Sequence, residues 1–257
     1  MKLISLNTWG GKLYKPLLKY IKDQSKDTDI FCFQEVFKTS SDIKEYVKLR
    51  LNLYDEISGI LTDFNPYFAP TQEKYIFFTG FVDFDLSFGL VIFVRKNIRV
   101  TSSGDFFVFR ERNGLDPQNP RFTIPRNLQY LEFIENNKKV IIGNFHGIWF
   151  PGPKTDSPSR IDQSKKIAKF FEKQTGGKIL CGDFNLSIKT ESLKILEKDM
   201  RNLIKEYKIP TTRSELYDRA DDKFADYTFV SKDIEISNFQ VPSIEVSDHL
   251  PMVLEFS

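Results

Sequence analysis

The chain has 257 residues, and its 37 Lys and Arg nearly balance its 35 Asp and Glu, which leaves a formal net charge of +2. This balance argues against tight non-specific binding of nucleic acid, which depends on a dense Lys and Arg surface. No stretch approaches the roughly 18 apolar residues of a membrane span, and the chain opens without a signal-like segment, so we expect a cytoplasmic protein.

The sequence predicts one domain over residues 1–257 and a monomer. The length would allow two domains, but large α/β folds often exceed about 200 residues as one unit, and the motifs described below run from Asn7 to His249. Cys32 and Cys181 lie in apolar runs, and no Cys or His cluster has the spacing of a zinc site. We therefore expect both cysteines to fill the core.

Apolar strand-like runs and helical periodicity alternate along the chain. In chain order we expect a strand at 2–7, a helix at 14–26, a strand at 29–33, a helix at 41–51 capped by Ser40 or Ser41, and strands flanking a turn within 68–84. Strands follow at 88–95, 100–109, 129–135 and 140–146, with Asn136 and Asn137 as a hairpin turn. A long loop at 147–157, a helix at 159–174, a strand at 178–181, a helix at 192–197 and strands at 226–230, 234–241 and 252–256 complete the order.

The two histidines of the chain occur in short polar motifs, Asn144-Phe145-His146-Gly147 and Ser247-Asp248-His249-Leu250. Imidazole has the side-chain pKa nearest neutrality, so it is a common proton carrier in hydrolytic sites. Further polar residues end apolar runs: Asn7, Glu35 after Gln34, and Asp183 and Asn185 in Gly182-Asp183-Phe184-Asn185.

Each of these residues has a structural alternative. A single His after a strand is often only a buried structural residue, an Asp or Asn there commonly forms a turn, and Glu35 could be a solvated loop charge. Their shared position favours a site, because α/β sheets bind ligands at the carboxyl ends of their strands.

The order of these motifs, together with Ala225-Asp226-Tyr227, resembles that of the endonuclease/exonuclease/phosphatase superfamily. The resemblance spans most of the chain, and Gly-Asp-Phe-Asn and Ser-Asp-His are its most specific motifs. It implies a four-layer α/β sandwich like that of deoxyribonuclease I, with two packed mixed sheets flanked by helices. It also implies a metal-dependent phosphoesterase activity, although members differ in substrate.

A hard divalent cation, Mg²⁺ with Mn²⁺ as a substitute, would suit this chemistry because it prefers oxygen ligands. The matching family positions imply Glu35 as the first ligand, Asn7 as a ligand or orienting group, and Asp248 as a further ligand or supporting carboxylate.

The remaining motif residues carry the predicted proton chemistry. Asp183 would orient or deprotonate the attacking water, and Asn185, two residues along an extended segment, would face the same side. His249 would contact the phosphate or move a proton, with Asp226 fixing its tautomer and raising its pKa. His146 matches the deoxyribonuclease-like and phosphatase-like branches, whereas the abasic-site endonucleases carry Tyr at that position.

Substrate identity stays open at this stage. Candidate substrate-binding residues are Arg112 and Arg121 in the segment 110–126, Trp149, Arg160 and Arg213. Arg160 and Gln163 could instead brace the fold, and the 110–126 loop could be solvated. Nucleic acid is the leading predicted substrate. A small-molecule or lipid-headgroup phosphate is the alternative, and a catalytically silent binding module is the third hypothesis.

Overall fold

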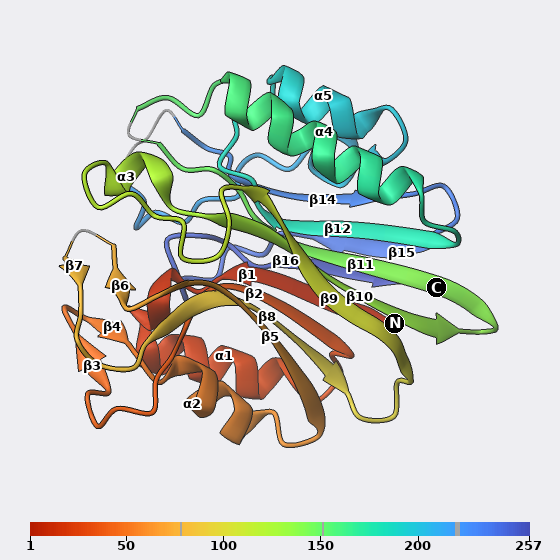
Figure 1. Ribbon diagram of the computed structural model, residues 1–257. Coiled ribbons are helices and arrows are strands. Elements are labelled where there is room, and N and C mark those ends of the chain that lie inside the picture. Colours follow the sequence, from red (N-terminus) through yellow and green to blue (C-terminus); the bar gives the residue numbers. More distant parts are fainter. Residues whose placement is uncertain (78, 151, 219–221) are drawn as a thin grey trace.

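The computed structural model describes residues 1–77, 79–150, 152–218 and 222–257. Two six-stranded mixed sheets pack face to face, and helices cover their outer faces (Figure 1). The order in the first sheet is β15 (Ile236–Gln240), β16 (Met252–Phe256), β1 (Lys2–Asn7), β2 (Ile30–Lys38), β8 (Ser87–Arg95) and β5 (Phe64–Glu73). The order in the second is β13 (Arg201–Asn202), β14 (Asp226–Val230), β12 (Gly177–Asp183), β11 (Lys138–His146), β10 (Arg126–Glu135) and β9 (Val100–Phe109). This is the predicted four-layer α/β sandwich.

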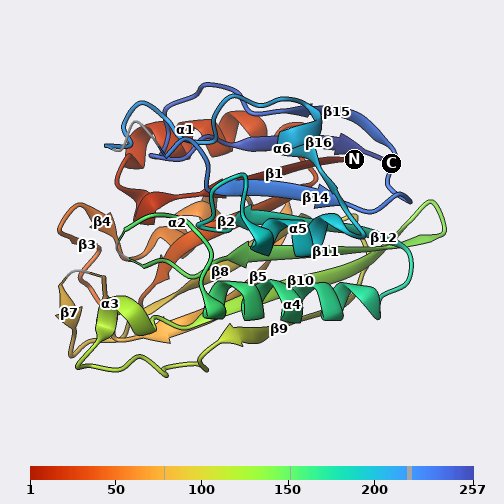
Figure 2. The ribbon, with the colours of Figure 1, turned by 90° about the horizontal axis from the view of Figure 1, so that it is seen from above.

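The helices are segregated by sheet. Helices α1 (Tyr14–Gln24) and α2 (Leu53–Ile60) lie against the first sheet, and α4 (Pro158–Glu172) and α5 (Glu191–Glu197) lie against the second (Figures 1 and 2). Shorter helices are η1 (Trp9–Gly11), α3 (Pro120–Thr123) and α6 (Leu203–Glu206). No helix within the described residues is long and apolar enough to cross a bilayer.

The central strands are buried on both faces, as the layers of a sandwich require. In β2, residues 30–34 are all buried, because one face packs on helices and the other on the second sheet. Cys32 and Cys181 are buried in the core cluster that joins both sheets, as core filling requires. A separate cluster between the first sheet and α1 and α2 includes Leu17, Ile21 and Phe93.

Most predicted elements form with small shifts at their ends. The strands expected at 2–7, 100–109, 226–230 and 252–256 have the observed bounds, and the helices expected at 14–26, 159–174 and 192–197 are α1, α4 and α5. Asn136 and Asn137 have φ of 49° and 59°, as a two-residue hairpin turn requires. In the predicted loop 147–157, Pro151 lies outside the described residues.

The helix expected at 41–51 is wrong. This segment forms a small hairpin of β3 (Glu45–Tyr46) and β4 (Leu49–Arg50), turning at Val47 and Lys48 with φ of 49° and 66°. The hairpin lets Leu49 join a small apolar cluster, so tertiary packing overrides the helical pattern. A second hairpin, β6 (Tyr75–Ile76) with β7 (Gly80–Phe81), lies beside it at the left of Figure 1.

A buried amide connects the two sheets. Asn144 of β11 directs its Nδ2 toward the carbonyl oxygens of Phe33 and Val91 in the first sheet, at 3.1 and 3.2 Å. Its Oδ1 accepts from Gln34 Nε2 of β2 at 2.7 Å. Both side chains are fully buried, so these hydrogen bonds between the sheets satisfy groups that water cannot reach.

Asn144→Ala should therefore lower the free energy of unfolding by about 3 kcal/mol, because it leaves several buried groups unsatisfied. Denaturant unfolding followed by circular dichroism measures the change. Asn238→Ala on the edge strand β15 is the matched control, and we expect a change within about 0.5 kcal/mol. Equal losses in both variants would contradict the inter-sheet role.

Candidate active site

The predicted site residues meet at one edge of the sandwich, at the left of Figure 1. Strands β1, β11 and β12 end there, whereas β14 and β16 begin there because they run antiparallel to β12 and β1. The register places His146 beside Asp183, and Asp183 beside Asp226. Neighbouring strands of the second sheet thus deliver an imidazole and two carboxylates side by side.

These side chains line a cavity of about 350 Å³ between the sheet edge and the two hairpins. The polar lining residues include Glu35, Arg126, His146, Asp183, Asn185, Arg213, Asp248 and His249. Asn7 and Asp226 lie directly behind them, each hydrogen-bonded to a lining side chain.

Glu35 lies inside β2 and not at a strand end as the sequence predicts. The ladder between β2 and β8 shifts register between Phe33 and Val36, and Glu35 has a φ of 58°, in the left-handed region. Such a bulge turns one side chain away from the regular alternation at a local conformational cost. It directs the Glu35 carboxylate into the cavity.

The amide of Asn7 joins two carboxylates from different sheets. Its Nδ2 donates to Glu35 Oε1 at 3.1 Å and to Asp183 Oδ2 at 3.0 Å. Its Oδ1 accepts from the backbone N–H of Trp9 at 3.0 Å. Of the two predicted roles for Asn7, this arrangement favours the orienting one.

Asp183 and Asn185 both line the cavity, but for a different reason than predicted. Strand β12 ends at Asp183, and Asn185 has a φ of 52°, so the segment is a tight turn and not extended. The turn brings the Asn185 backbone N–H to Asp183 Oδ1 at 2.8 Å and the Asn185 amide to Gly147 O at 3.3 Å. The Asp183 carboxylate is therefore held at both oxygens.

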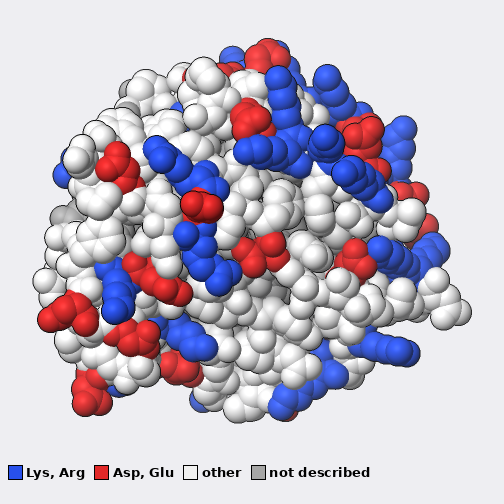
Figure 3. Space-filling view, viewed as in Figure 1, with Lys and Arg blue, Asp and Glu red and all other residues white. Residues whose placement is uncertain are grey.

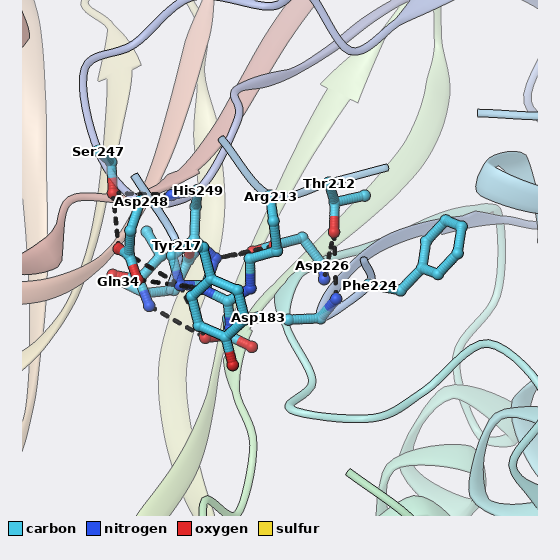
Figure 4. Close-up of polar contacts among 12 residues, drawn as sticks. Gln34, Asp183, Thr212, Arg213, Tyr217, Phe224, Asp226, Ser247, Asp248 and His249 are labelled. Atoms are coloured by element: carbon cyan, nitrogen blue, oxygen red, sulfur yellow. Dashed lines mark hydrogen bonds and ion pairs between the residues drawn. The ribbon is translucent and has the colours of Figure 1, made fainter. Parts of the chain in front are cut away.

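His249 is held between Asp226 and Arg213 (Figure 4). Its Nδ1 contacts both Asp226 oxygens at 2.9 and 2.8 Å, and its Nε2 contacts the Arg213 Nη1. Because a guanidinium can only donate, Nε2 accepts and Nδ1 carries the proton donated to Asp226. The backbone N–H of Asp226 donates in turn to Thr212 Oγ1 at 3.2 Å.

The expectation that the pKa of His249 is raised is wrong. Burial lowers the pKa of His249 to about 4, and the charge of Arg213 acts in the same direction. The imidazole is therefore neutral and presents Nε2 to the cavity. Asp226 still fixes its tautomer.

His146 is held in the opposite tautomer by Arg126. Arg126 Nη1 lies 3.0 Å from His146 Nδ1, which must accept, so Nε2 carries the proton and lies 3.7 Å from both Glu35 Oε1 and Asp183 Oδ2. Burial and Arg126 lower the pKa of His146 well below its usual value. Arg126 is a site residue that the sequence did not reveal, because the strand was expected to begin at 129 and residue 126 to lie in the loop before it.

The predicted substrate-binding residues separate into two groups. Arg213 and Trp149 line the cavity. Arg160 is buried and donates to the carbonyl oxygens of Ile148, Pro153 and Thr155, so it braces the loop after β11. Gln163 accepts from the Ile148 N–H and shares that bracing role. The substrate-binding alternative for Arg160 is therefore wrong.

Arg112 and Arg121 lie outside the set of cavity-lining residues. The Arg112 side chain is 47% exposed and lies 3.9 Å from Asp105, and Arg121 is exposed on α3. The segment 110–126 is not one continuous loop, because α3 interrupts it and Arg126 begins β10. Its end, at Ile124 and Arg126, lines the cavity.

Three carboxylates, those of Glu35, Asp183 and Asp248, line the cavity together, and such a group suits a hard cation. Burial and the neighbouring Asp248 raise the pKa of Glu35 to about 7. Ligand atoms of Asp183, Asp226 and His249 also lie within 4.8 Å of one another. Asp226 is already hydrogen-bonded to Nδ1 of His249, so the carboxylates on the Glu35 side are the better oxygen donors for a hard cation.

The raised pKa of Glu35 predicts a pH-dependent stability difference in metal-free protein. A carboxyl whose pKa is higher in the folded state stabilises at acid pH, and that contribution is lost as pH rises from about 4 to about 7. Between about pH 5 and pH 8 the native protein should lose more stability than Glu35→Gln, by on the order of 1 to 2 kcal/mol for this partly exposed side chain. Denaturant unfolding in chelator measures it. Parallel pH profiles of the two proteins would show that Glu35 titrates normally.

Comparison with known proteins gives one family. A model described as the endonuclease/exonuclease/phosphatase family matches residues 4–249. No curated protein sequence matches the chain.

Solved structures share the fold at low sequence identity. A mannosyl-6-phosphatase from Bacteroides thetaiotaomicron has a TM-score of 0.72 and 16% identity, covering 100% of this chain and 99% of that one. The human Nocturnin catalytic domain with bound sulfate has a TM-score of 0.70 and 17% identity, covering 100% and 93%. A humanized TDP2 from D. rerio has a TM-score of 0.70 and 14% identity, covering 100% and 98%. Because the family match extends over nearly the whole chain, the protein belongs to the endonuclease/exonuclease/phosphatase family.

Proposed function

We propose that this protein is a hydrolase of phosphate esters that depends on a divalent cation, Mg²⁺ or Mn²⁺. The observation that carries the proposal is the meeting of Glu35, Asp183, Asp248 and two neutral, tautomer-fixed imidazoles in one cavity. This set supplies oxygen donors for a hard cation and proton donors and acceptors for an ester. A silent binding module has no need of such a set. Because the cavity takes residues from both sheets, we also propose that the chain acts as one domain.

Glu35 and Asp248 would hold the cation, with Asn7 orienting Glu35. Their mutual repulsion, seen in the raised pKa of Glu35, is the kind of imbalance that a cation relieves. A bound Mg²⁺ would neutralise phosphate charge and stabilise the leaving oxygen.

Asp183 would orient and deprotonate the attacking water. Its Oδ2 lies 3.7 Å from His146 Nε2 and 3.6 Å from His249 Nε2, at the centre of the polar floor. Asn7 and the Asn185 N–H hold the carboxylate in place. Asn185 would add an amide donor to the phosphate.

The two imidazoles would have different roles, because His146 presents an N–H to the cavity and His249 presents an acceptor nitrogen. His146 Nε2–H, fixed by Arg126, can donate to a phosphate or leaving-group oxygen. Arg213 now donates to His249 Nε2 and would turn to an entering phosphate oxygen. His249 could then take up a proton, and Asp226 would stabilise the imidazolium.

Two substrate classes fit this chemistry. Nucleic acid is the class that the sequence favoured. A small phosphate ester is favoured by the shape of the site, because the cavity is compact and the predicted clamp residues Arg112 and Arg121 do not line it.

Hydrolysis should require Mg²⁺ or Mn²⁺ and stop in excess EDTA, because the predicted cation neutralises the phosphate. A panel of phosphomonoesters, phosphodiesters, RNA and single-stranded DNA, followed by phosphate release or gel analysis, tests this. Restored activity on adding Mg²⁺ back excludes damage by the chelator. Full turnover in EDTA would refute the metal dependence.

His249→Ala and Asp183→Ala should each lower kcat at least about a hundredfold, the scale for a lost proton-transfer group. Asp226→Asn should act through His249, so it should give a smaller loss. The Asp226→Asn, His249→Ala double variant should be no worse than His249→Ala alone, because the two residues form one unit. Additive losses in steady-state kinetics would separate their roles. Arg112→Ala is the control and should keep the native rate.

A further inference from the structure

The cavity has two chemically different parts. Its floor consists of the charged and polar side chains described above. Its wall is aromatic, built from Trp9, Phe37, Tyr75, Phe77, Phe88 and Trp149. An apolar wall of this extent has no role in the proposed hydrolytic chemistry, so it points to the part of the substrate that does not react.

Ring contacts pack two parts of this wall, and one of these parts also contacts the floor. Phe88 packs on Phe37 at a centroid distance of 5.0 Å and on the His146 ring at 6.4 Å. Phe77 meets Trp149 edge-to-face at 5.1 Å and 88°. The wall therefore begins at an imidazole of the floor and is packed before any ligand enters.

The wall also comes from segments outside the strand ends that form the floor. Tyr75 and Phe77 belong to the β6–β7 hairpin and its turn, and Trp149 to the loop braced by Arg160. The β3–β4 hairpin adds the apolar side chains of Val47 and Leu49.

Few cations line the cavity itself. Among the described lining residues the cations are Lys12, Arg126 and Arg213. Arg126 and Arg213 are buried against the imidazoles, and Lys12 Nζ lies 4.2 Å from the Trp9 ring. In Figure 3 the densest Lys and Arg groups lie toward the upper right, over α4, away from the hairpins at the left. A polynucleotide held along its backbone needs several further phosphate contacts.

We infer that the substrate is a compact phosphate ester whose organic group is apolar and ring-shaped and lies against the aromatic wall, with its phosphate on the polar floor. This inference rests on the proposed function and names its substrate class. The cavity volume of about 350 Å³ is at the small end of ligand sites, which run from about 300 to 1,000 Å³. The ring could belong to a free small molecule or to the terminal nucleoside of a strand, since both present the same chemistry to the wall.

Binding of phosphonates tests the wall without depending on turnover, because their C–P bond is not an ester. Both tryptophans of the chain line the cavity, so tryptophan fluorescence reports binding directly. In excess Mg²⁺, benzylphosphonate should bind at least about tenfold more tightly than methylphosphonate, because burying a ring removes apolar surface from water.

Phe77→Ala should reduce this preference to less than about threefold and leave the affinity for methylphosphonate unchanged. Phe77→Leu should restore part of it, which separates lost apolar contact from a disturbed hairpin. Phe122→Ala is the matched control, because that ring is 52% exposed and does not line the cavity. It should keep the native preference.

Three results would overturn the inference. One is equal affinity of the native protein for the two phosphonates, or no binding of either. Another is a benzyl preference that Phe77→Ala does not change. The third is competition by oligothymidylates that strengthens with each added nucleotide and falls steeply with salt, as backbone binding requires. Competition by thymidine 5′-monophosphate equal to that of longer oligomers would support the inference and place the ring at a strand end or in a free nucleotide.

The same experiment distinguishes failure of the inference from failure of the proposed function. A benzyl preference that depends on Phe77, with no hydrolysis of any phosphate ester in Mg²⁺, would refute the hydrolase and leave the aromatic subsite. Metal-dependent hydrolysis with no benzyl preference would support the hydrolase and refute the aromatic subsite.

Discussion

Two carboxamide bridges across the gap between the sheets determine where everything else in this site lies. Asn7 of the first sheet donates to Asp183 of the second, and Gln34 of the first donates to Asn144 of the second. Two apolar faces alone could slide against each other with little cost, whereas these buried amides lose hydrogen bonds if the sheets shift. The two sheets are therefore fixed relative to each other at the edge that carries the carboxylates and imidazoles.

The electrostatics of the site follow from two buried arginines. Arg126 donates to His146 and Arg213 donates to His249, so each imidazole stays neutral with a defined ring nitrogen facing the cavity. The two guanidinium groups offset part of the negative charge of Glu35, Asp183 and Asp248. The pKa of Glu35 is still raised, because its carboxyl is buried and lies near Asp248. A site that balanced its own charges fully would be more stable, and it would have less attraction for a cation. The burial and repulsion that raise the pKa of Glu35 therefore cost stability, and the proposed cation would offset that cost.

Sequence patterns could predict the sheets and most of the polar floor, because both depend on local features. Apolar runs mark buried strands, and ligand-type residues recur where those runs stop. The 41–51 helix failed because Leu49 gains its packing partners only in the hairpin. The bulge at Glu35 depends on pairing with β8, and the exclusion of Arg112 and the bracing role of Arg160 depend on where distant segments lie. Contacts between distant segments produce no periodic pattern in a single sequence.

The origin of the two parts of the cavity gives them different freedom to change. Half of the polar floor, namely Glu35, Arg126, His146 and Asp183, is carried by sheet strands whose register and inter-sheet bridges are fixed, so altering it disturbs the core. Half of the aromatic wall, namely Tyr75, Phe77 and Trp149, is carried by a hairpin and a loop at the edge of the sandwich, where insertions and replacements cost the core little (Figure 1). The same polar floor can therefore be combined with different apolar side chains in the wall. On this view the chemistry of the protein follows from its family, whereas its substrate follows from Phe77, Trp149 and their neighbours.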